Sequence, residues 1–162
     1  KNKNVYVIGS GDVRFQFIHA EDLINAYMLI YNRGISGTFN IGTDEFGTLR
    51  EALENLIKSA DSKSKVRSLP IFPSIFALKL LDFLKLSPLA PWHYLTYHKE
   101  FHFDITDLKN LGWKSKYSND RMLIESYKWF LSNESKISST TNKSPHRTPV
   151  QENILKLIRF FS

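Results

Sequence analysis

The chain has 162 residues, of which 42% are hydrophobic and 14% aromatic, enough for one domain with a packed core. Its formal net charge of +6 allows an anionic ligand, an acidic surface or a nucleic acid as partner, without choosing among them. The absence of cysteine excludes a disulfide framework and a thiolate metal site, and no apolar run reaches the ~20 residues of a membrane-spanning helix.

The first elements lead into a dense polar corner. A buried strand is predicted at Val5–Ile8, followed by a glycine turn at Gly9–Asp12. A short apolar run, Phe15–Ile18, precedes a helix that ends near Asn32. The nine positions from Arg14 to Asp22, in the first turn of the helix, hold an arginine, an amide, an imidazole and two carboxylates. Such strand-to-helix corners often carry sites in α/β proteins, although turn and cap chemistry explains most of these residues equally well.

Short strands and a capped helix are expected in the middle of the chain. Thr38–Ile41 and Val66–Leu69 have the composition of strands. Between them, Thr48 and Glu51 have the spacing of a capping box, which opens an amphipathic helix.

The next segment is strongly apolar. Pro70 ends the second of these strands, and a helix is predicted from Ser74 to Leu86. This helix is apolar nearly all round, which indicates burial against a larger body than this chain offers. The segment from Pro70 to Trp92 is interpreted with equal weight as a pocket wall or as core. The fold of residues 93–98 stays open.

The C-terminal third divides into three parts. A short strand is expected at Phe101–Asp104, a brief helix at Asp107–Leu111 and a long final helix capped by Asn119 or Asp120. We therefore place one domain at residues 1–132, a flexible linker rich in Ser, Thr, Asn, Lys and Pro at 133–149, and a short amphipathic helix at 150–162.

Motifs for several kinds of chemistry are missing. No phosphate-binding loop is present, and Gly9 and Gly11 precede a strand-like run where a dinucleotide fingerprint precedes a helix. His93, His98 and His102 do not have standard metal-ligand spacing, so surface or lining histidines are preferred to a metal site. The basic linker lacks interleaved aromatic residues, and nucleic acid is not expected as a partner. The last helix offers only weak membrane attachment, without stable insertion.

An ordered series of motifs resembles the extended short-chain dehydrogenase/reductases, the NAD-dependent epimerase/dehydratase family. The series is Gly9-x-Gly11, Arg14-Phe-Gln-Phe-Ile-His-Ala-Glu-Asp-Leu23, Phe39-Asn-Ile-Gly42 and Leu111-Gly-Trp113. It covers Val5 to Leu131. The resemblance implies an α/β fold with short strands and several helices, the C-terminal part of a Rossmann-type enzyme that lacks its N-terminal dinucleotide-binding half.

The resemblance also implies that the catalytic machinery lies elsewhere. NAD or NADP is bound in the family by the N-terminal half, which supplies a Tyr-x-x-x-Lys pair. Tyr94 and Tyr97 are followed four residues later by His98 and Phe101, so neither forms that pair. Because the sequence runs from Lys1 almost directly into a strand, we expect it to be a piece of a longer cytoplasmic enzyme. We expect this piece to be inactive alone. The resemblance is compatible with a homodimer of the longer enzyme.

The expected substrate is a nucleotide sugar. The candidate binding residues are Arg14, Gln16, Phe17, His19, Pro70 and Trp92. One departure from the family limits this expectation, because Phe15 stands where sugar-nucleotide epimerases use an arginine to grip the diphosphate. His19 is interpreted as a corner residue that acts through hydrogen bonds rather than as a proton carrier. The alternative function is a non-catalytic binding or interaction module derived from the same fold.

Overall fold

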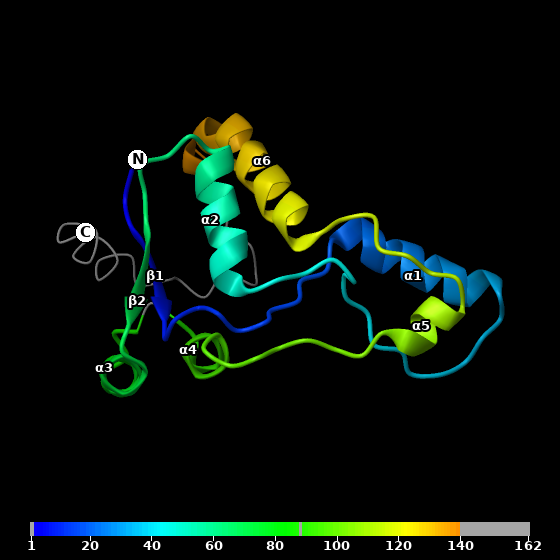
Figure 1. The fold of residues 1–162 in the computed structure, drawn as a ribbon, viewed down its shortest axis with the longest axis horizontal. Coiled ribbons are helices and arrows are strands. Elements are labelled where there is room, and N and C mark those ends of the chain that lie inside the picture. Colours follow the sequence, from blue (N-terminus) through cyan, green and yellow to red (C-terminus); the bar gives the residue numbers. More distant parts are fainter. Residues whose placement is uncertain (1, 88, 140–162) are drawn as a thin grey trace.

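The computed structural model describes residues 2–87 and 89–139, which form a mixed α/β domain (Figure 1). Its two-stranded parallel sheet joins β1 (Val5–Ile8) to β2 (Val66–Leu69), with Val5 opposite Val66 and Ile8 opposite Leu69. Parallel strands need a long crossover. Here the crossover contains α1 (Ala20–Asn32) and α2 (Leu49–Ser59). The bounds of both strands and the Thr48–Glu51 capping box confirm the sequence predictions. The predicted burial of β1 is wrong, because only Val7 is buried and Tyr6 is 42% exposed at the edge of a two-stranded sheet.

The remaining helices lie around this sheet and around α1. Helices α3 (Ile71–Phe83) and α4 (Pro91–Thr96) lie side by side at the sheet end of the molecule (Figure 1). Helix α6 (Asn119–Ser139) packs against α2. Helix α5 (Thr106–Asn110) lies at the opposite end, beneath α1. None of the helices in the described part of the chain is both long enough and apolar enough to cross a membrane.

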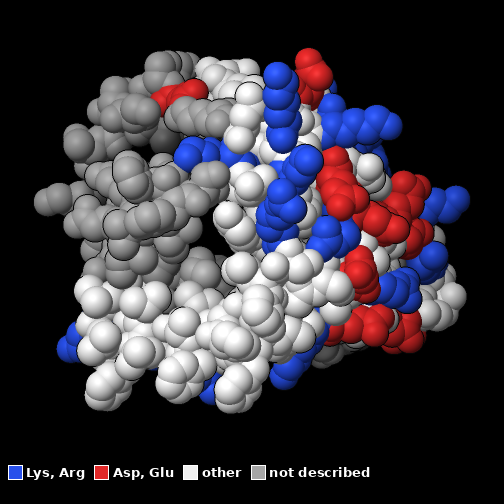
Figure 2. Space-filling model, turned by 60° about the vertical axis from the view of Figure 1, so that its left-hand side comes forward, with Lys and Arg blue, Asp and Glu red and all other residues white. Residues whose placement is uncertain are grey.

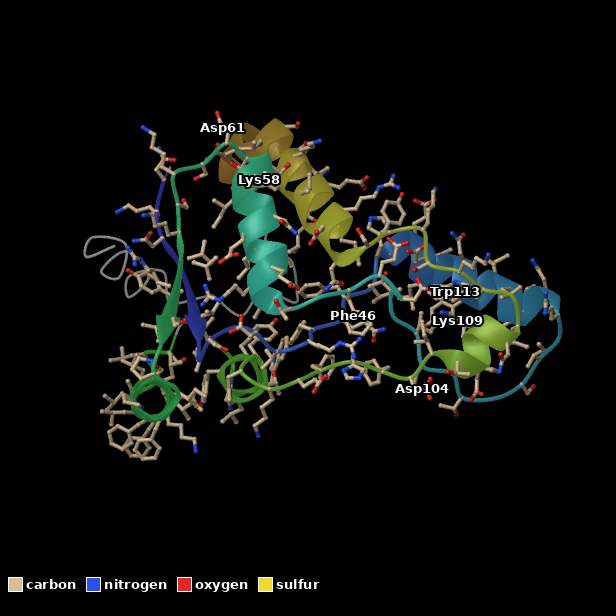
Figure 3. All side chains as sticks on the ribbon, in the orientation of Figure 1. Phe46, Lys58, Asp61, Asp104, Lys109 and Trp113 are labelled. Atoms are coloured by element: carbon tan, nitrogen blue, oxygen red, sulfur yellow. The ribbon has the colours of Figure 1, made fainter. Side chains whose placement is uncertain are left out.

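The main apolar cluster sits between α1 and α5. Ala26 and Leu108 are fully buried there, and Ile105 and Trp113 complete the cluster. Trp113 follows α5 and reaches back toward α1 (Figure 3). The positive φ of +80° at Gly112 supports this reversal, because glycine adopts the left-handed conformation without strain. The predicted stop of this helix at Gly112 is thereby confirmed.

Two predicted strands are wrong. Residues 38–41 and 101–104 form no strand, because neither segment finds a neighbour for a continuous ladder. Phe101 makes only an isolated parallel bridge to Phe15. Two residues later, the N–H of Phe103 donates to the Gln16 side chain at 2.9 Å. A side-chain oxygen thus takes the place of the backbone carbonyl that would continue a ladder.

Helix boundaries differ from the predictions at three places. Helix α3 begins at Ile71 rather than Ser74, because a proline in the first turn withholds only an N–H that has no intrahelical partner. Helix α6 is capped by the Ser118 hydroxyl, which accepts the Arg121 N–H at 3.3 Å, and not by Asn119 or Asp120. It continues to Ser139, so the first residues predicted as linker are helical, while the division of the chain into domain, linker and terminal helix stays a prediction. The rest of that linker and the helix at 150–162 lie outside the described residues.

Candidate functional site

The corner between β1 and α1 is held from within by Gln16. This side chain is 6% exposed and uses both ends of its amide. Its Nε2 donates to the Thr43 carbonyl at 2.6 Å, while its Oε1 accepts from Phe103. A Cβ at Gly42 would collide with the Gln16 amide, so the close approach requires glycine there. Gln16 is therefore a structural clamp whose amide faces the protein interior.

A second clamp comes from the start of α6. Asn119 is buried, and its Nδ2 donates to the Phe15 carbonyl at 2.5 Å. Its Oδ1 accepts the N–H of Phe17 at 3.0 Å. Phe17 also presents its carbonyl to the Thr43 N–H at 3.0 Å. The predicted residue Phe17 thus ties the corner to two distant segments through its backbone.

The buried carboxylate of Asp22 binds the loop before α6. It is 1% exposed and accepts the backbone N–H groups of Lys116 and Tyr117 at 3.0 and 3.1 Å. The Thr43 hydroxyl donates to the Tyr117 carbonyl at 2.7 Å. A buried carboxylate is tolerated when backbone donors satisfy it. These bonds bring the Phe-Asn-Ile-Gly segment and the segment after Leu-Gly-Trp to the corner.

His19 forms the exposed edge of this corner. Its Nδ1 accepts the Glu21 N–H at 3.2 Å, which makes it the N-cap of α1. Its ring stacks on Tyr117 with centroids 3.8 Å apart. Because Nδ1 is an acceptor, the proton of the neutral ring lies on Nε2. The bond from the Glu21 N–H agrees with a hydrogen-bonding role at the corner, and the role of His19 toward a substrate stays a prediction.

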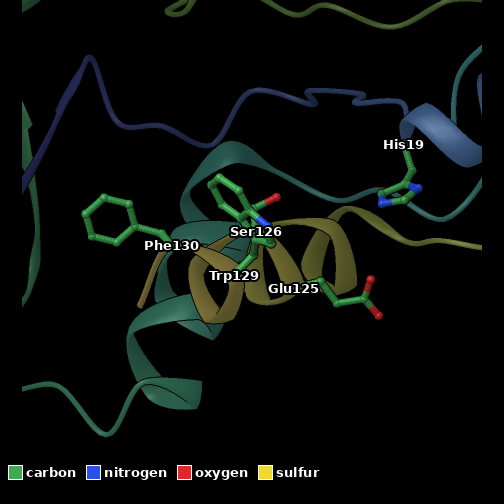
Figure 4. Close-up of a pocket in the computed structure, with 5 residues that line it drawn as sticks. All are labelled: His19, Glu125, Ser126, Trp129 and Phe130. Carbon is green, nitrogen blue, oxygen red and sulfur yellow. The ribbon is translucent and has the colours of Figure 1, made fainter. Parts of the chain in front are cut away.

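An open hollow of about 600 Å³ lies between His19 and α6 (Figure 4). Its other lining residues are Glu125, Ser126, Trp129 and Phe130. Trp129 is 62% exposed, so its indole face is available to a ligand. The hollow therefore combines an imidazole, a carboxylate, a hydroxyl and two aromatic rings.

Charged groups surround the stacked pair. The Lys116 ammonium and then the Tyr117 hydroxyl, both bonded to Glu21, hold the pKa of that carboxyl below its usual value. The same contact with Glu21 raises the pKa of the Tyr117 hydroxyl and of Lys116. The guanidinium of Arg121 lies 4.5 Å from the Tyr117 ring centroid and pairs with Glu125 at 2.9 Å. The hollow is thus bordered by charges that are already paired.

The other predicted site residues lie apart from this hollow. The Arg14 guanidinium lies 4.7 Å from the centroid of the Phe46 ring. Pro70 is the N-cap of α3, beyond the end of β2. Trp92 is 57% exposed and stacks on His93. The structure therefore does not bring Pro70 or Trp92 to the corner, and the described residues from Pro70 to Trp92 form neither a wall of the hollow nor part of the main apolar cluster.

Phe15 connects the corner to α4 through aromatic contacts. It is 6% exposed, with its ring centroid 5.2 Å from that of Tyr97 and 5.4 Å from that of Phe101. Phe17 packs on its other side at 5.1 Å. An aromatic cluster thus occupies the position where the family resemblance implies a phosphate-binding arginine.

Sequence reasoning missed Tyr117, Asn119 and Trp129. Only the neighbouring Leu-Gly-Trp motif marked the region of the first two, and their contacts with the corner span about a hundred positions of sequence. Trp129 lies in the long final helix, of which no residue is among the candidate binding residues. No local pattern indicates that it would border His19.

The described side chains form no metal-binding group, and two helix starts do not suit a dinucleotide. No group of three or more His, Asp or Glu residues within residues 2–87 and 89–139 is placed to hold a metal ion. A pyrophosphate needs free N–H groups at a helix N-terminus. At α1 that position carries Glu21 and Asp22, and at α2 the capping box of Thr48 and Glu51 occupies the amides. The starts of α1 and α2 therefore do not fit the pyrophosphate of NAD or NADP.

Comparisons with known proteins identify the fold. No protein-family model matches the chain. The uncharacterised protein y4nG of Sinorhizobium fredii is 38% identical over 158 residues, which cover 97% of this chain and 40% of that protein. The dTDP-D-glucose 4,6-dehydratase of Mus musculus is 26% identical over 136 residues, 82% of this chain and 33% of that enzyme. The chain therefore spans two fifths or less of the length of these relatives.

Two solved structures have the same arrangement. The dTDP-glucose 4,6-dehydratase of Bacillus anthracis, in complex with NAD, has a TM-score of 0.56 at 18% identity, covering 82% of this chain and 36% of that one. The UDP-N-acetylglucosamine 4-epimerase of Bacillus cereus has a TM-score of 0.51 at 13% identity, covering 79% and 36%. The chain shares its fold with part of these enzymes. The resemblance to extended short-chain dehydrogenase/reductases is thus confirmed for the fold.

Proposed function

We propose that this chain is the C-terminal, substrate-binding part of an NAD(P)-dependent oxidoreductase of the nucleotide-sugar epimerase/dehydratase kind. The observation that carries the proposal is the clamped corner, which holds His19 at the edge of an open hollow. The 26% identity to a dTDP-D-glucose 4,6-dehydratase supports the same class of reaction. The cofactor and the catalytic tyrosine and lysine belong, in this proposal, to a part of the cytoplasmic protein outside this chain.

The chain's own contribution is to hold the substrate. The Nε2–H of His19 is a donor for a hydroxyl or phosphate oxygen, and Trp129 offers a face on which a sugar or base can stack. Hydrogen bonds of Gln16, Asn119 and Asp22 fix the corner before substrate binds. Binding therefore costs little conformational entropy there. Positioning of a substrate against catalytic groups can lower a barrier by several kcal/mol.

A non-catalytic binding module remains the second candidate, and Phe15 is the observation in its favour. A ring buried among Tyr97 and Phe101 offers no cation for a diphosphate. Arg14, one position earlier, has its guanidinium over Phe46 and is the nearest cation in sequence to Phe15.

The coding sequence upstream of Lys1 and a ligand panel test the proposal together. We expect a glycine-rich dinucleotide fingerprint and a Tyr-x-x-x-Lys pair upstream. We also expect NAD(H) or NADP(H), and a dTDP- or UDP-sugar, to raise the melting temperature of the protein at its natural length. A reading frame that opens near Lys1, or no stabilisation by any dinucleotide, contradicts the oxidoreductase and leaves the binding module.

A further inference from the structure

The hollow between His19 and α6 is lined by a carboxylate but by no lysine or arginine within the described part of the chain. The carboxylate is that of Glu125, whose side chain is 41% exposed. Its Oε1 accepts from the Arg121 Nε at 2.9 Å, and no other hydrogen bond joins it to a residue that the structure describes. Oε2 of Glu125 is therefore free to accept a hydrogen bond from a ligand.

This distribution of charge disfavours a diphosphate in the hollow. A diphosphate is strongly anionic, and its binding next to the Glu125 carboxylate is opposed by like-charge repulsion. The basic residues that border the hollow already have partners, since Lys116 pairs with Glu21 at 2.7 Å and Arg121 pairs with Glu125. The space-filling view shows a similar mixture of signs over one side of the molecule, where acidic side chains lie next to basic ones (Figure 2). A ligand of the hollow is therefore selected by local groups rather than by a broad basic surface.

The hydrogen-bonding groups of the hollow favour a sugar ring over a nucleobase. The Glu125 carboxylate only accepts hydrogen bonds, whereas the Nε2–H of His19 donates one. Each hydroxyl of a sugar both donates and accepts, so one ring satisfies both side chains. In uracil and thymine, carbonyl oxygens flank the N–H, and a carboxylate repels these oxygens. A sugar ring is therefore the better partner for this pair of groups.

Trp129 adds a surface on which a sugar ring can stack. Its side chain is 62% exposed, and it lies four positions after Glu125 on α6, so both side chains share one face of the helix (Figure 4). The C–H groups of a sugar ring carry partial positive charge, which the negative face of an indole attracts. The hollow, at about 600 Å³, lies within the range of roughly 300–1,000 Å³ that is typical of small-molecule sites.

We propose that the hollow binds the sugar ring of the substrate and that Glu125 is a specificity-determining residue. Its carboxylate accepts sugar hydroxyls and excludes phosphate, while Trp129 stacks on the ring and His19 donates to a further hydroxyl. The diphosphate of the substrate then lies outside the hollow. This inference rests on the proposed function, because it takes the substrate to be a nucleotide sugar.

Isothermal titration calorimetry of the protein at its natural length tests this assignment with two pairs of ligands. The pairs are dTDP-glucose with dTDP, and UDP-glucose with UDP, so the members of each pair differ only by the sugar. Trp129→Ala should bind the nucleotide sugar about three- to tenfold more weakly, because the stacking is lost. Glu125→Gln should bind it about tenfold more weakly, because hydrogen bonds to a charged acceptor are the stronger ones. Both variants should bind dTDP or UDP like the parent.

Each substitution has a matched control. Glu54 on α2 also pairs with an arginine four positions earlier, Arg50, at 3.3 Å, so Glu54→Gln removes a similar ion pair away from the hollow. Tyr31→Ala removes an aromatic side chain on α1 that is 79% exposed. Both controls should bind every ligand like the parent. Trp129→Phe keeps an aromatic face and should recover part of the affinity for the nucleotide sugar. Melting temperatures verify that all variants are folded.

Three results overturn the assignment while the proposed function stands, because the parent still binds a nucleotide sugar. The first is an equal loss of affinity for dTDP and dTDP-glucose in Trp129→Ala, which places the nucleotide in the hollow. The second is several-fold tighter binding of dTDP by Glu125→Gln, which means that the carboxylate repels a phosphate bound there. The third is unchanged affinity in both variants, which places the sugar elsewhere. If the parent binds neither nucleotide sugar, the proposed function fails and this inference fails with it.

Discussion

His19 and Tyr117 stack with ring centroids 3.8 Å apart and an interplanar angle of 20°. The His19 ring belongs to the N-cap of α1, and the Tyr117 ring belongs to the loop before α6. The stack therefore joins the corner to the start of the helix that lines the hollow. Together with the Glu21 N–H on Nδ1, it fixes the plane of the imidazole. The orientation of His19 therefore depends on a residue far away in the sequence.

Changing Tyr117 should alter substrate binding more than turnover. In the protein at its natural length, Tyr117→Leu removes the stacking and should raise KM about three- to tenfold, because such pairs contribute about 0.5–1.5 kcal/mol. Tyr117→Phe keeps the stacking and should raise KM less. We expect kcat to change little in both variants, as measured by steady-state kinetics with a nucleotide sugar. A tenfold fall in kcat with unchanged KM would contradict a positioning role.

Loss of the Asn119 clamp should destabilise the domain. Asn119→Ala leaves the Phe15 carbonyl and the Phe17 N–H buried without partners, which should lower the free energy of unfolding by about 2–4 kcal/mol. The control is Asn55→Ala, which removes an exposed bond to Asp120 and should cost under about 0.5 kcal/mol. Urea unfolding compares the two variants. Equal costs would mean that Asn119 is not a clamp.

The contact of Gly42 with Gln16 should appear as energetic coupling. Gly42→Ala places a methyl group against the buried amide and should cost about 1–3 kcal/mol. In a Gln16→Ala background the same substitution should cost at least about 1 kcal/mol less, because the colliding group is gone. A double-mutant cycle measured by urea unfolding gives this difference. A coupling energy near zero would show that Gly42 is required for some other reason.

Acid should release the network around Glu21. Its pKa is lowered in the folded protein, by Lys116 first, so its contribution to stability is present above the unfolded value of about 4.3 and is lost as the pH falls through the lower folded value. Glu21→Gln should therefore flatten the acid side of a plot of urea midpoint against pH. The charge-matched control, Glu54→Gln on α2, should keep the slope. Identical slopes for Glu21→Gln and the parent would contradict this role.

The alkaline side has the opposite sign. The bond to Glu21 raises the pKa of the Tyr117 hydroxyl, so its contribution is complete below the unfolded value of about 10 and is lost as the pH rises through the higher folded value. In Tyr117→Phe this alkaline loss should become smaller, and the remaining loss comes from Lys116, whose pKa the same carboxylate raises. Midpoints measured between pH 8 and 11.5 test it, and an unchanged alkaline slope would exclude Tyr117 as the cause.

Local chemistry predicted much of the fold. The capping box at Thr48, the glycine stop at Gly112 and both strands of the sheet follow from neighbouring residues. The segments at 38–41 and 101–104 were predicted as strands from their composition, but a strand also needs a partner, which composition does not show. In place of ladders they have single contacts, such as the Asn40 amide on the Asp104 carbonyl at 3.1 Å.

The candidate site was predicted only in part. His19 was found because its polarity and position at a helix start are visible in the sequence. Gln16 looks equally polar there, yet its amide is buried and faces the protein interior. Tyr117 and Asn119 contact corner residues that lie about a hundred positions earlier in the sequence, and no local periodicity predicts such contacts.

Turnover of a nucleotide-sugar panel tests the proposed division of the enzyme most directly. The protein at its natural length and the 162-residue chain are compared with dTDP- and UDP-sugars, with NAD or NADP added and product followed by chromatography. We expect turnover by the natural-length protein and none by the chain alone, and His19→Ala should raise KM in the former. Turnover by the 162 residues alone, or none by the natural-length protein with any sugar, would contradict the proposed function.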